Sequence, residues 1–161
     1  MTVGLVLDRA NDPTSLISGN WAERQSGLAA FGSQAAVWAQ YGADPALYNT
    51  TVTQVAGVVG NGALAAPTAL GYVSSAADRT IWVTLDRTQF ADLFGTSLLE
   101  VSGGSGKTLA WTGNLSLNSA IGANAIAGLW FERMVTVPSP NVLVSTPVAL
   151  TPGPLGIANA S

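Results

Sequence analysis

The chain contains no cysteine and no histidine among its 161 residues. The missing cysteine excludes disulfides, thiol catalysis and cysteine-based metal sites. The missing histidine excludes a Ser–His–Asp triad, and it leaves pH sensing to carboxylates, which ordinarily titrate near pH 4. Glu23, Glu100 and Glu132 lie apart from any aspartate at helical spacing that could orient them. We therefore predict no catalytic residue, cofactor or metal in this chain. A carboxylate pair for glycoside cleavage stays open as an alternative, but no spacing singles one out.

Charged residues are also scarce, at 9% of the chain, and the net charge is −3. Phosphate binding requires clustered cations, whereas the six cations are scattered, at Arg9, Arg24, Arg79, Arg87, Lys107 and Arg133. Nucleic acid is therefore excluded as an expected partner. Low charge also means little self-repulsion when carboxylates protonate, which favours tolerance of acid. A low-charge secreted surface protein is the alternative interpretation of the same composition.

The apolar content is high, with a mean hydropathy of +0.35, but no apolar run approaches the roughly 18 residues of a membrane span. We therefore expect no membrane span. Met1 leads directly into the apolar segment Val3–Leu7, which lacks a basic preceding region and is too short for a signal peptide, so none is visible.

Residues Asp78–Val101 carry the clearest local pattern. Ile81, Val83 and Leu85 alternate with polar or amphipathic residues, which predicts a half-buried strand. Asp86 followed by Gln89 forms a capping-box pattern. The helix that this pattern begins has an apolar face and ends at Gly95, and Leu98, Leu99 and Val101 then predict another strand.

The remaining elements complete an α+β arrangement. Val3–Leu7 predicts a first strand, and Asn11-Asp12-Pro13 marks a loop over Arg9–Ser18. Two helices are expected at Ser33–Tyr41 and Asp44–Val59. A strand is expected at Leu70–Ser74, and a hairpin or arm at Lys107–Leu117. The order of the strands and helices is βαββαβ, which predicts a ferredoxin-like antiparallel sheet with helices on one face. Five prolines and no charge between 136 and 161 predict an extended C-terminal arm. We expect residues 1–134 to form one domain and 135–161 to be its linker or arm.

Two further patterns could suggest ligand binding. Ser102–Thr108 resembles a phosphate-binding loop, but Val101 stands where the motif requires glycine, so a hairpin loop is favoured. Five tryptophans could form a sugar-binding platform, although core and edge packing is the favoured interpretation: Trp21, Trp38, Trp82, Trp111 and Trp130.

Three stretches together resemble the activation prodomain (pro-kumamolisin type) of the sedolisin serine-carboxyl peptidases. Trp38–Ala46 is similar to the family's joint between prodomain helices, with its aromatic, glycine, acid and proline. Asp78–Leu85 with Phe90–Leu98 resembles the strand and the helix that ends in "aromatic-Gly-Thr-x-Leu". Ile121–Leu129 resembles the final prodomain turn. The likeness covers residues 3–131 approximately. It departs from the family at Asn118, where proline is common, and at Gly19–Phe31, which replaces a His/Tyr-rich segment.

The resemblance implies a secreted, non-catalytic domain that acts as intramolecular chaperone and inhibitor of an acid-acting peptidase. The partner would be a sedolisin-type peptidase domain, in cis or in trans, and the catalytic residues and calcium site would belong to that domain. We expect Asp78, Asp86, Asp92 and Glu100 to contribute to the contact, with bonds that are lost as the carboxylates protonate. Helix capping and turn solvation are the alternative roles of these acids. A free-standing inhibitor or binding module of the same fold is the first alternative function, and a structural or sugar-binding surface domain is the second.

Overall fold

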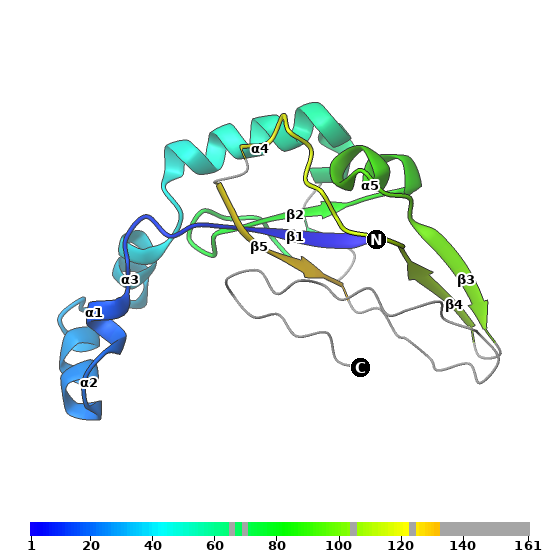
Figure 1. Cartoon of the computed structure of the whole chain (residues 1–161). Coiled ribbons are helices and arrows are strands. Elements are labelled where there is room, and N and C mark those ends of the chain that lie inside the picture. The colour runs from blue at the N-terminus through cyan, green and yellow to red at the C-terminus, as the bar shows by residue number, and fades with distance from the viewer. Residues whose placement is uncertain (65–66, 69–70, 104–105, 123–124, 133–161) are drawn as a thin grey trace.

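The computed structural model describes residues 1–64, 67–68, 71–103, 106–122 and 125–132. This part of the chain is a mixed α+β structure (Figure 1). Its strands are β1 (Thr2–Leu7), β2 (Thr80–Thr84), β3 (Leu99–Gly103), β4 (Gly106–Ala110) and β5 (Ile126–Phe131). Its helices are α1 (Thr14–Ile17), α2 (Trp21–Ala29), α3 (Gln34–Tyr41), α4 (Pro45–Val59) and α5 (Arg87–Phe94), with a short 3₁₀ turn η1 at Asn61–Leu64.

A three-stranded antiparallel sheet forms the centre of the molecule, in the order β2-β1-β5. Helices α4 and α5 lie on the same side of it (Figure 1). Val3, Leu5 and Leu7 of β1 are fully buried, because alternate residues of a strand face the same side and here meet the helices. Their neighbours in the core come from every element around them, including Val55, Val59, Ile81, Val83, Phe90, Leu93 and Phe94.

The caps of the two core helices confirm the local predictions. Asp44 accepts a hydrogen bond from the Leu47 N–H at 2.8 Å, and Pro45 stands in the first turn of α4. Asp86 accepts from the Gln89 N–H at 2.8 Å, and the Gln89 side chain accepts from the Asp86 N–H at 2.9 Å, which completes the capping box. Gly95 ends α5 in the left-handed region, at φ 66°.

The last strand of the sheet is not where the sequence pattern places it. Leu98–Val101 was expected to fill that position, but β3 pairs with β4 in a separate hairpin, and β5 lies beside β1 instead. The reason is burial. Leu99 and Val101 are exposed, whereas Leu129 and Phe131 of β5 pack against the core. The predicted hairpin at Lys107–Leu117 therefore begins earlier, at Leu99, and its strands end at Ala110. The Ser102–Thr108 motif lies within this hairpin, as the favoured interpretation expects.

The strand expected at Leu70–Ser74 is also wrong over residues 71–74. Leu70 itself lies outside the described residues. Gly71, at φ 80°, turns the chain back so that the Thr68 N–H donates to the Tyr72 carbonyl at 3.0 Å. Only an isolated bridge joins Ser75 to Thr80 of β2. The hydroxyl of Ser74 accepts from the Trp82 N–H at 2.8 Å, where a strand would have offered a backbone carbonyl.

Helices α1, α2 and α3 form an N-terminal arm that extends away from the sheet (Figure 1). None of the three contains a buried residue. The helix expected at Ser33–Tyr41 is confirmed, with Ser33 as its N-cap. The arm joins the body through backbone contacts, such as the Ala10 N–H to the Gly42 carbonyl at 2.7 Å and the Ala43 N–H to the Ala76 carbonyl at 2.8 Å.

Two arm helices were missed by the sequence analysis. Helix α1 interrupts the loop predicted over Arg9–Ser18, and α2 lies within a segment that received no prediction. A signal for α2 was present, because Asn20 and Glu23 form a full capping box.

The α+β class and the small antiparallel sheet are confirmed, and α4 and α5 cover one face of it. The ferredoxin-like βαββαβ arrangement is not confirmed. The predicted domain boundary at 134 and the Pro-rich arm at 135–161 lie outside the described residues.

Candidate binding face of the sheet

The sheet face opposite α4 and α5 is the first candidate site, and we call it the distal face. It is formed by the residues of each strand that alternate with the core residues: Thr2, Gly4 and Val6 of β1, Thr80, Trp82 and Thr84 of β2, and Trp130 of β5. The positions follow from the register, because Val3 pairs with Val83 and Phe131, and all three face the helices.

Two tryptophans lie in one row across the distal face, on either side of a glycine. Gly4 of β1 is directly opposite Trp82 of β2 and directly opposite Trp130 of β5. The Cα atoms of Trp82 and Trp130 are therefore about 10 Å apart, which is twice the spacing between neighbouring strands. A Cβ atom placed on Gly4 would lie only 2.9 Å from Cζ3 of Trp82, so the Trp82 ring leans over the glycine. We call Trp82, Gly4 and Trp130 the aromatic row.

The aromatic row continues beyond the edge of β2. Tyr72 stacks on Trp82 with ring centroids 4.3 Å apart and an interplanar angle of 13°. Trp130 is 61% exposed at the other end of the row, and Val73 is 58% exposed beside Tyr72. Trp82 between them is half-buried. Exposed aromatic side chains such as Tyr72 and Trp130 are typical of binding surfaces, because they offer a large apolar area at a small cost in side-chain entropy.

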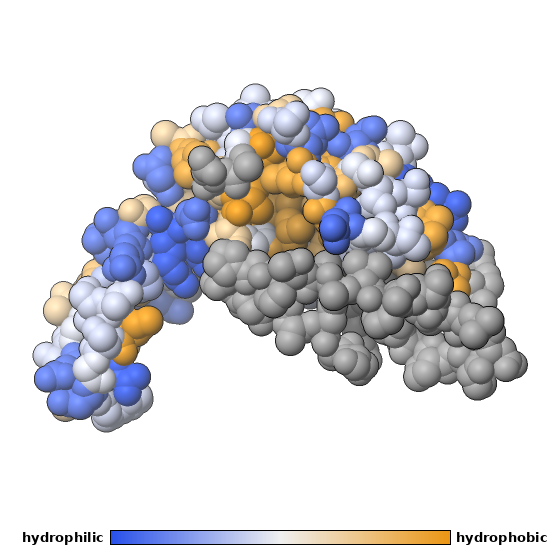
Figure 2. All heavy atoms as spheres, viewed as in Figure 1, coloured by the Kyte–Doolittle hydropathy of each residue, from blue (hydrophilic) through white to orange (hydrophobic). Residues whose placement is uncertain are grey.

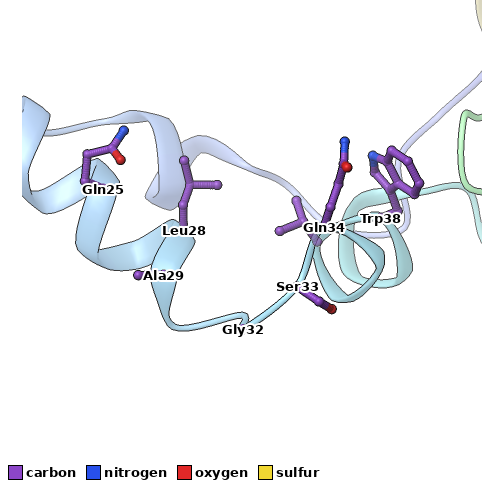
Figure 3. A pocket seen from close by; sticks show the side chains of 8 residues that line it. Gln25, Leu28, Ala29, Gly32, Ser33, Gln34 and Trp38 are labelled. Atoms are coloured by element: carbon purple, nitrogen blue, oxygen red, sulfur yellow. The ribbon is translucent and has the colours of Figure 1, made fainter.

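A shallow pocket in the arm is the second candidate. It lies between α2 and α3, and Figure 3 shows its lining side chains: Gln25, Leu28, Ala29, Gly32, Ser33, Gln34, Val37 and Trp38. None of these residues is titratable, so the pocket offers packing and amide hydrogen bonds but no acid–base chemistry. Figure 2 shows mainly hydrophilic residues over the arm, with a small hydrophobic patch.

The four acids predicted at an interface do not form one cluster. Asp78 precedes β2 and Asp86 follows it, so the length of the strand separates them. Asp78 accepts from the Ser75 hydroxyl at 2.7 Å, and Asp86 caps α5, which confirms local structural roles for both. Glu100 lies 3.8 Å from the Arg87 guanidinium, and Asp92 is exposed on α5. Their role at an interface stays a prediction.

Shifted pKa values occur away from the aromatic row. Burial raises the pKa of the Tyr48 hydroxyl, and the charge of Asp78 acts in the same direction, while a hydrogen bond with Ser74 opposes both. Hydrogen bonds from Thr14 lower the pKa of Asp12. Burial lowers the pKa of Arg79, the nearby Arg9 adds to this effect, and Asp8 opposes it. Tyr48 lies on α4, Asp12 lies in the loop before α1, and Arg79 directly precedes β2, so these groups do not converge on one site.

The five tryptophans are divided among three regions. Trp21 and Trp38 lie on the arm, and Trp82 and Trp130 lie on the distal face. Trp111 is half-buried and contacts Phe90 and Phe131, with ring centroids 5.8 Å and 4.9 Å away. A single sugar-binding platform of all five is therefore wrong. The sequence pattern did not single out Trp82 and Trp130, because only the register of β1 brings them into one row.

Within the described residues, no group of three or more acidic side chains is placed to hold a metal ion. No helix in this part of the chain has the length and apolar character to cross a membrane. A comparison of the chain with protein-family models, with curated proteins and with solved structures finds no match. The likeness to sedolisin prodomains therefore depends on the residues quoted above.

Proposed function

We propose that this chain is a non-catalytic prodomain that acts as the intramolecular chaperone and inhibitor of an acid-acting, secreted serine-carboxyl peptidase. The two ends of the aromatic row are the observation that carries the proposal, because Trp130 is 61% exposed at one end and Tyr72 is exposed where it stacks on Trp82 at the other. Thr2, Val6 and Thr80 of the same face are buried, so these aromatic ends are the apolar area that is offered to a protein partner. Aromatic residues are the residues that most often dominate binding energy at protein interfaces. The sedolisin-type partner itself comes from the sequence resemblance.

The proposal includes a ferredoxin-like arrangement of the chain. The described strands have the order β2-β1-β5, with α4 between β1 and β2 in sequence and α5 between β2 and β5. The segment at residues 71–75 follows the outer edge of β2, where the fourth strand of such a sheet would lie. Because both core helices lie on one face, we assign the peptidase to the exposed ends of the aromatic row on the other face.

The test adds the full chain in trans to a refolding sedolisin-type peptidase domain. Recovered activity measures chaperoning, and residual activity after addition to native peptidase measures inhibition. We expect Trp82→Ala and Trp130→Ala each to weaken inhibition by roughly 30-fold, because an aromatic hot spot contributes about 2 kcal/mol to binding.

Trp21→Ala is the matched control, since Trp21 is 71% exposed but lies on the arm. Equal effects of all three substitutions would contradict docking through the distal face. No chaperoning and no inhibition by the unsubstituted chain would contradict the peptidase as partner and leave a free-standing binding module. A peptidase domain encoded after residue 161, with a Glu-x-x-x-Asp helix and a Gly-Thr-Ser turn, would support action in cis.

Carbohydrate binding is a second candidate function, favoured by the stacked Tyr72 and Trp82 and the exposed Trp130. Aromatic rings with an apolar face and a polar edge suit the stacking of sugar rings. Quenching of tryptophan fluorescence by oligosaccharides would support it if the quenching is lost in Trp130→Ala and kept in Trp21→Ala. Absence of quenching in the unsubstituted chain would exclude it for the sugars tested.

A further inference from the structure

We infer that β5 is a self-association edge, through which two copies of this chain join their sheets in antiparallel register centred on Trp130. The inference goes beyond the proposed function, because it concerns the edge of the sheet and a second copy of the chain. It starts from the direction of the backbone groups of β1 and β5.

The backbone of β1 alternates between its two neighbours. The Leu7 N–H donates toward the β2 side, to Arg79, whereas the Thr2 carbonyl accepts from Glu132 on the β5 side. The even-numbered residues of β1 therefore bond to β5, and Gly4 bonds with Trp130, its opposite residue. It follows that the N–H and C=O groups of Leu129 and Phe131 point away from β1, toward the free edge.

Nothing in the described part of the chain pairs with this edge. Within that part, the backbone of Leu129 and Phe131 has no hydrogen-bond partner on the side away from β1. The strand Ile126–Phe131 contains no charge and no proline, which are the residues that natural edge strands use to prevent pairing. The pairing of β1 with β5 is irregular between Val6 and Leu7, so the regular register ends at Gly128. The part of the edge that can pair with another strand is therefore Gly128–Phe131.

This short edge is complementary to itself. A two-fold axis at Trp130 places Leu129 opposite Phe131 of the second copy, so that all outward groups of these two residues are paired. The two Trp130 side chains then face each other as a non-hydrogen-bonded cross-strand pair, with Cα atoms about 4.5 Å apart. Aromatic pairs at such positions stabilise antiparallel sheets. Glu132 falls opposite Gly128 of the second copy, so no like charges meet.

The joined sheets extend the aromatic row across both copies, from one Trp82 to the other. The contact is small, with only a few residues from each copy, so it belongs to the weak end of protein interfaces. We therefore expect a dimer with a dissociation constant between about 1 μM and about 1 mM.

Sedimentation velocity on the full chain over this concentration range tests the inference without any peptidase present. We expect a concentration-dependent dimer whose paired indoles produce an exciton couplet in circular dichroism. Trp130→Lys should abolish the dimer in sedimentation, because two like charges would meet, while Trp21→Lys on the arm should keep both the dimer and the couplet. Thermal melting shows that each variant is folded.

A cross-link tests the register. The chain contains no cysteine, and Cα atoms about 4.5 Å apart are within disulfide range, so Trp130→Cys should form covalent dimers on mild oxidation. Thr84→Cys is the matched control, because Thr84 is exposed on the opposite edge strand of the same sheet. A monomeric chain at all concentrations, or equal cross-linking of both cysteine variants, overturns the inference. Monomers with the Leu129 and Phe131 amides protected from exchange would instead assign the edge to residues 133–161 and overturn it as well.

Discussion

Leu7 and Arg79 exchange two hydrogen bonds where β1 ends and β2 begins. The Leu7 N–H donates to the Arg79 carbonyl at 2.7 Å, and the Arg79 guanidinium donates to the Leu7 carbonyl at 2.8 Å. Arg79 has φ 58°, and it is the only non-glycine residue in the left-handed region within the described residues. The side chain therefore holds a backbone conformation that arginine adopts at a cost.

Substitution of Arg79 separates these two effects. Arg79→Ala removes the guanidinium bond and keeps the left-handed backbone, so we expect it to lower the free energy of unfolding by about 1–2 kcal/mol. Arg79→Gly removes the same bond but adopts positive φ freely, so it should be more stable than Arg79→Ala by about 1 kcal/mol. Urea denaturation of the three proteins measures the order. Equal stability of the two variants would show that the backbone at residue 79 is not strained.

Gly4 tests the packing of the aromatic row. Gly4→Ala places a methyl group 2.9 Å from the Trp82 ring, so the ring or the strand must move, and we expect a loss of about 1–3 kcal/mol of stability. Gly57 of α4 is the control, because a Cβ atom there meets nothing within 4 Å. Gly57→Ala should stabilise the helix by roughly 0.5–1 kcal/mol. A Gly4→Ala variant as stable as the unsubstituted chain would contradict the close approach of Trp82.

Local signals predicted part of this fold well. The segment from Thr80 to Gly95 was correct in each element, because strand alternation, a capping box and a C-terminal glycine all act within a few residues. The last sheet strand was misplaced because β5 is apolar throughout, so its pattern did not distinguish a strand from a turn. Leu99 and Val101 alternate as a buried strand would, yet they lie in a hairpin with exposed side chains.

The candidate site could not be predicted from the sequence in the same way. Trp82 and Trp130 are 48 residues apart in the numbering, and each lies opposite Gly4 only because of the register of β1 with both neighbours. A shift of one residue in either pairing would bring different residues opposite Gly4 and turn the side chains of the shifted strand to the other face. The register between strands that are far apart in the sequence is set by packing in the core. A local sequence pattern therefore does not predict it.

Tyr48 should make stability sensitive to alkaline pH. Its pKa in the folded chain is raised, mainly by burial, so the unfolded chain loses the phenolic proton first as the pH rises. The stabilising effect is complete below the unfolded pKa of about 10 and is lost as the pH rises through the folded value. The free energy of unfolding should therefore fall more steeply above about pH 10 in the unsubstituted chain than in Tyr48→Phe. Parallel curves for the two proteins would contradict this role.

The predicted acidic contacts make the proposed inhibition depend on four charged side chains. If Asp78, Asp86, Asp92 and Glu100 bond to the peptidase as carboxylates, replacing one of them by its amide removes a charge-assisted hydrogen bond. Each neutral variant should therefore inhibit a sedolisin-type peptidase more weakly than the unsubstituted chain does at the same pH. Asp92→Asn is the sharpest single substitution, since the backbone carbonyl of Asp92, and not its carboxylate, accepts the bond from Asn118.

Asp86→Asn serves as the matched comparison for Asp92→Asn. Asparagine caps helices about as well as aspartate, so the substitution removes the charge while the start of α5 is kept. Weaker inhibition by Asp92→Asn and by Asp86→Asn, with the thermal stability of both variants kept, would support the acidic contacts. Inhibition as strong as that of the unsubstituted chain would contradict them and leave these acids with their roles in caps, turns and the pairing with Arg87.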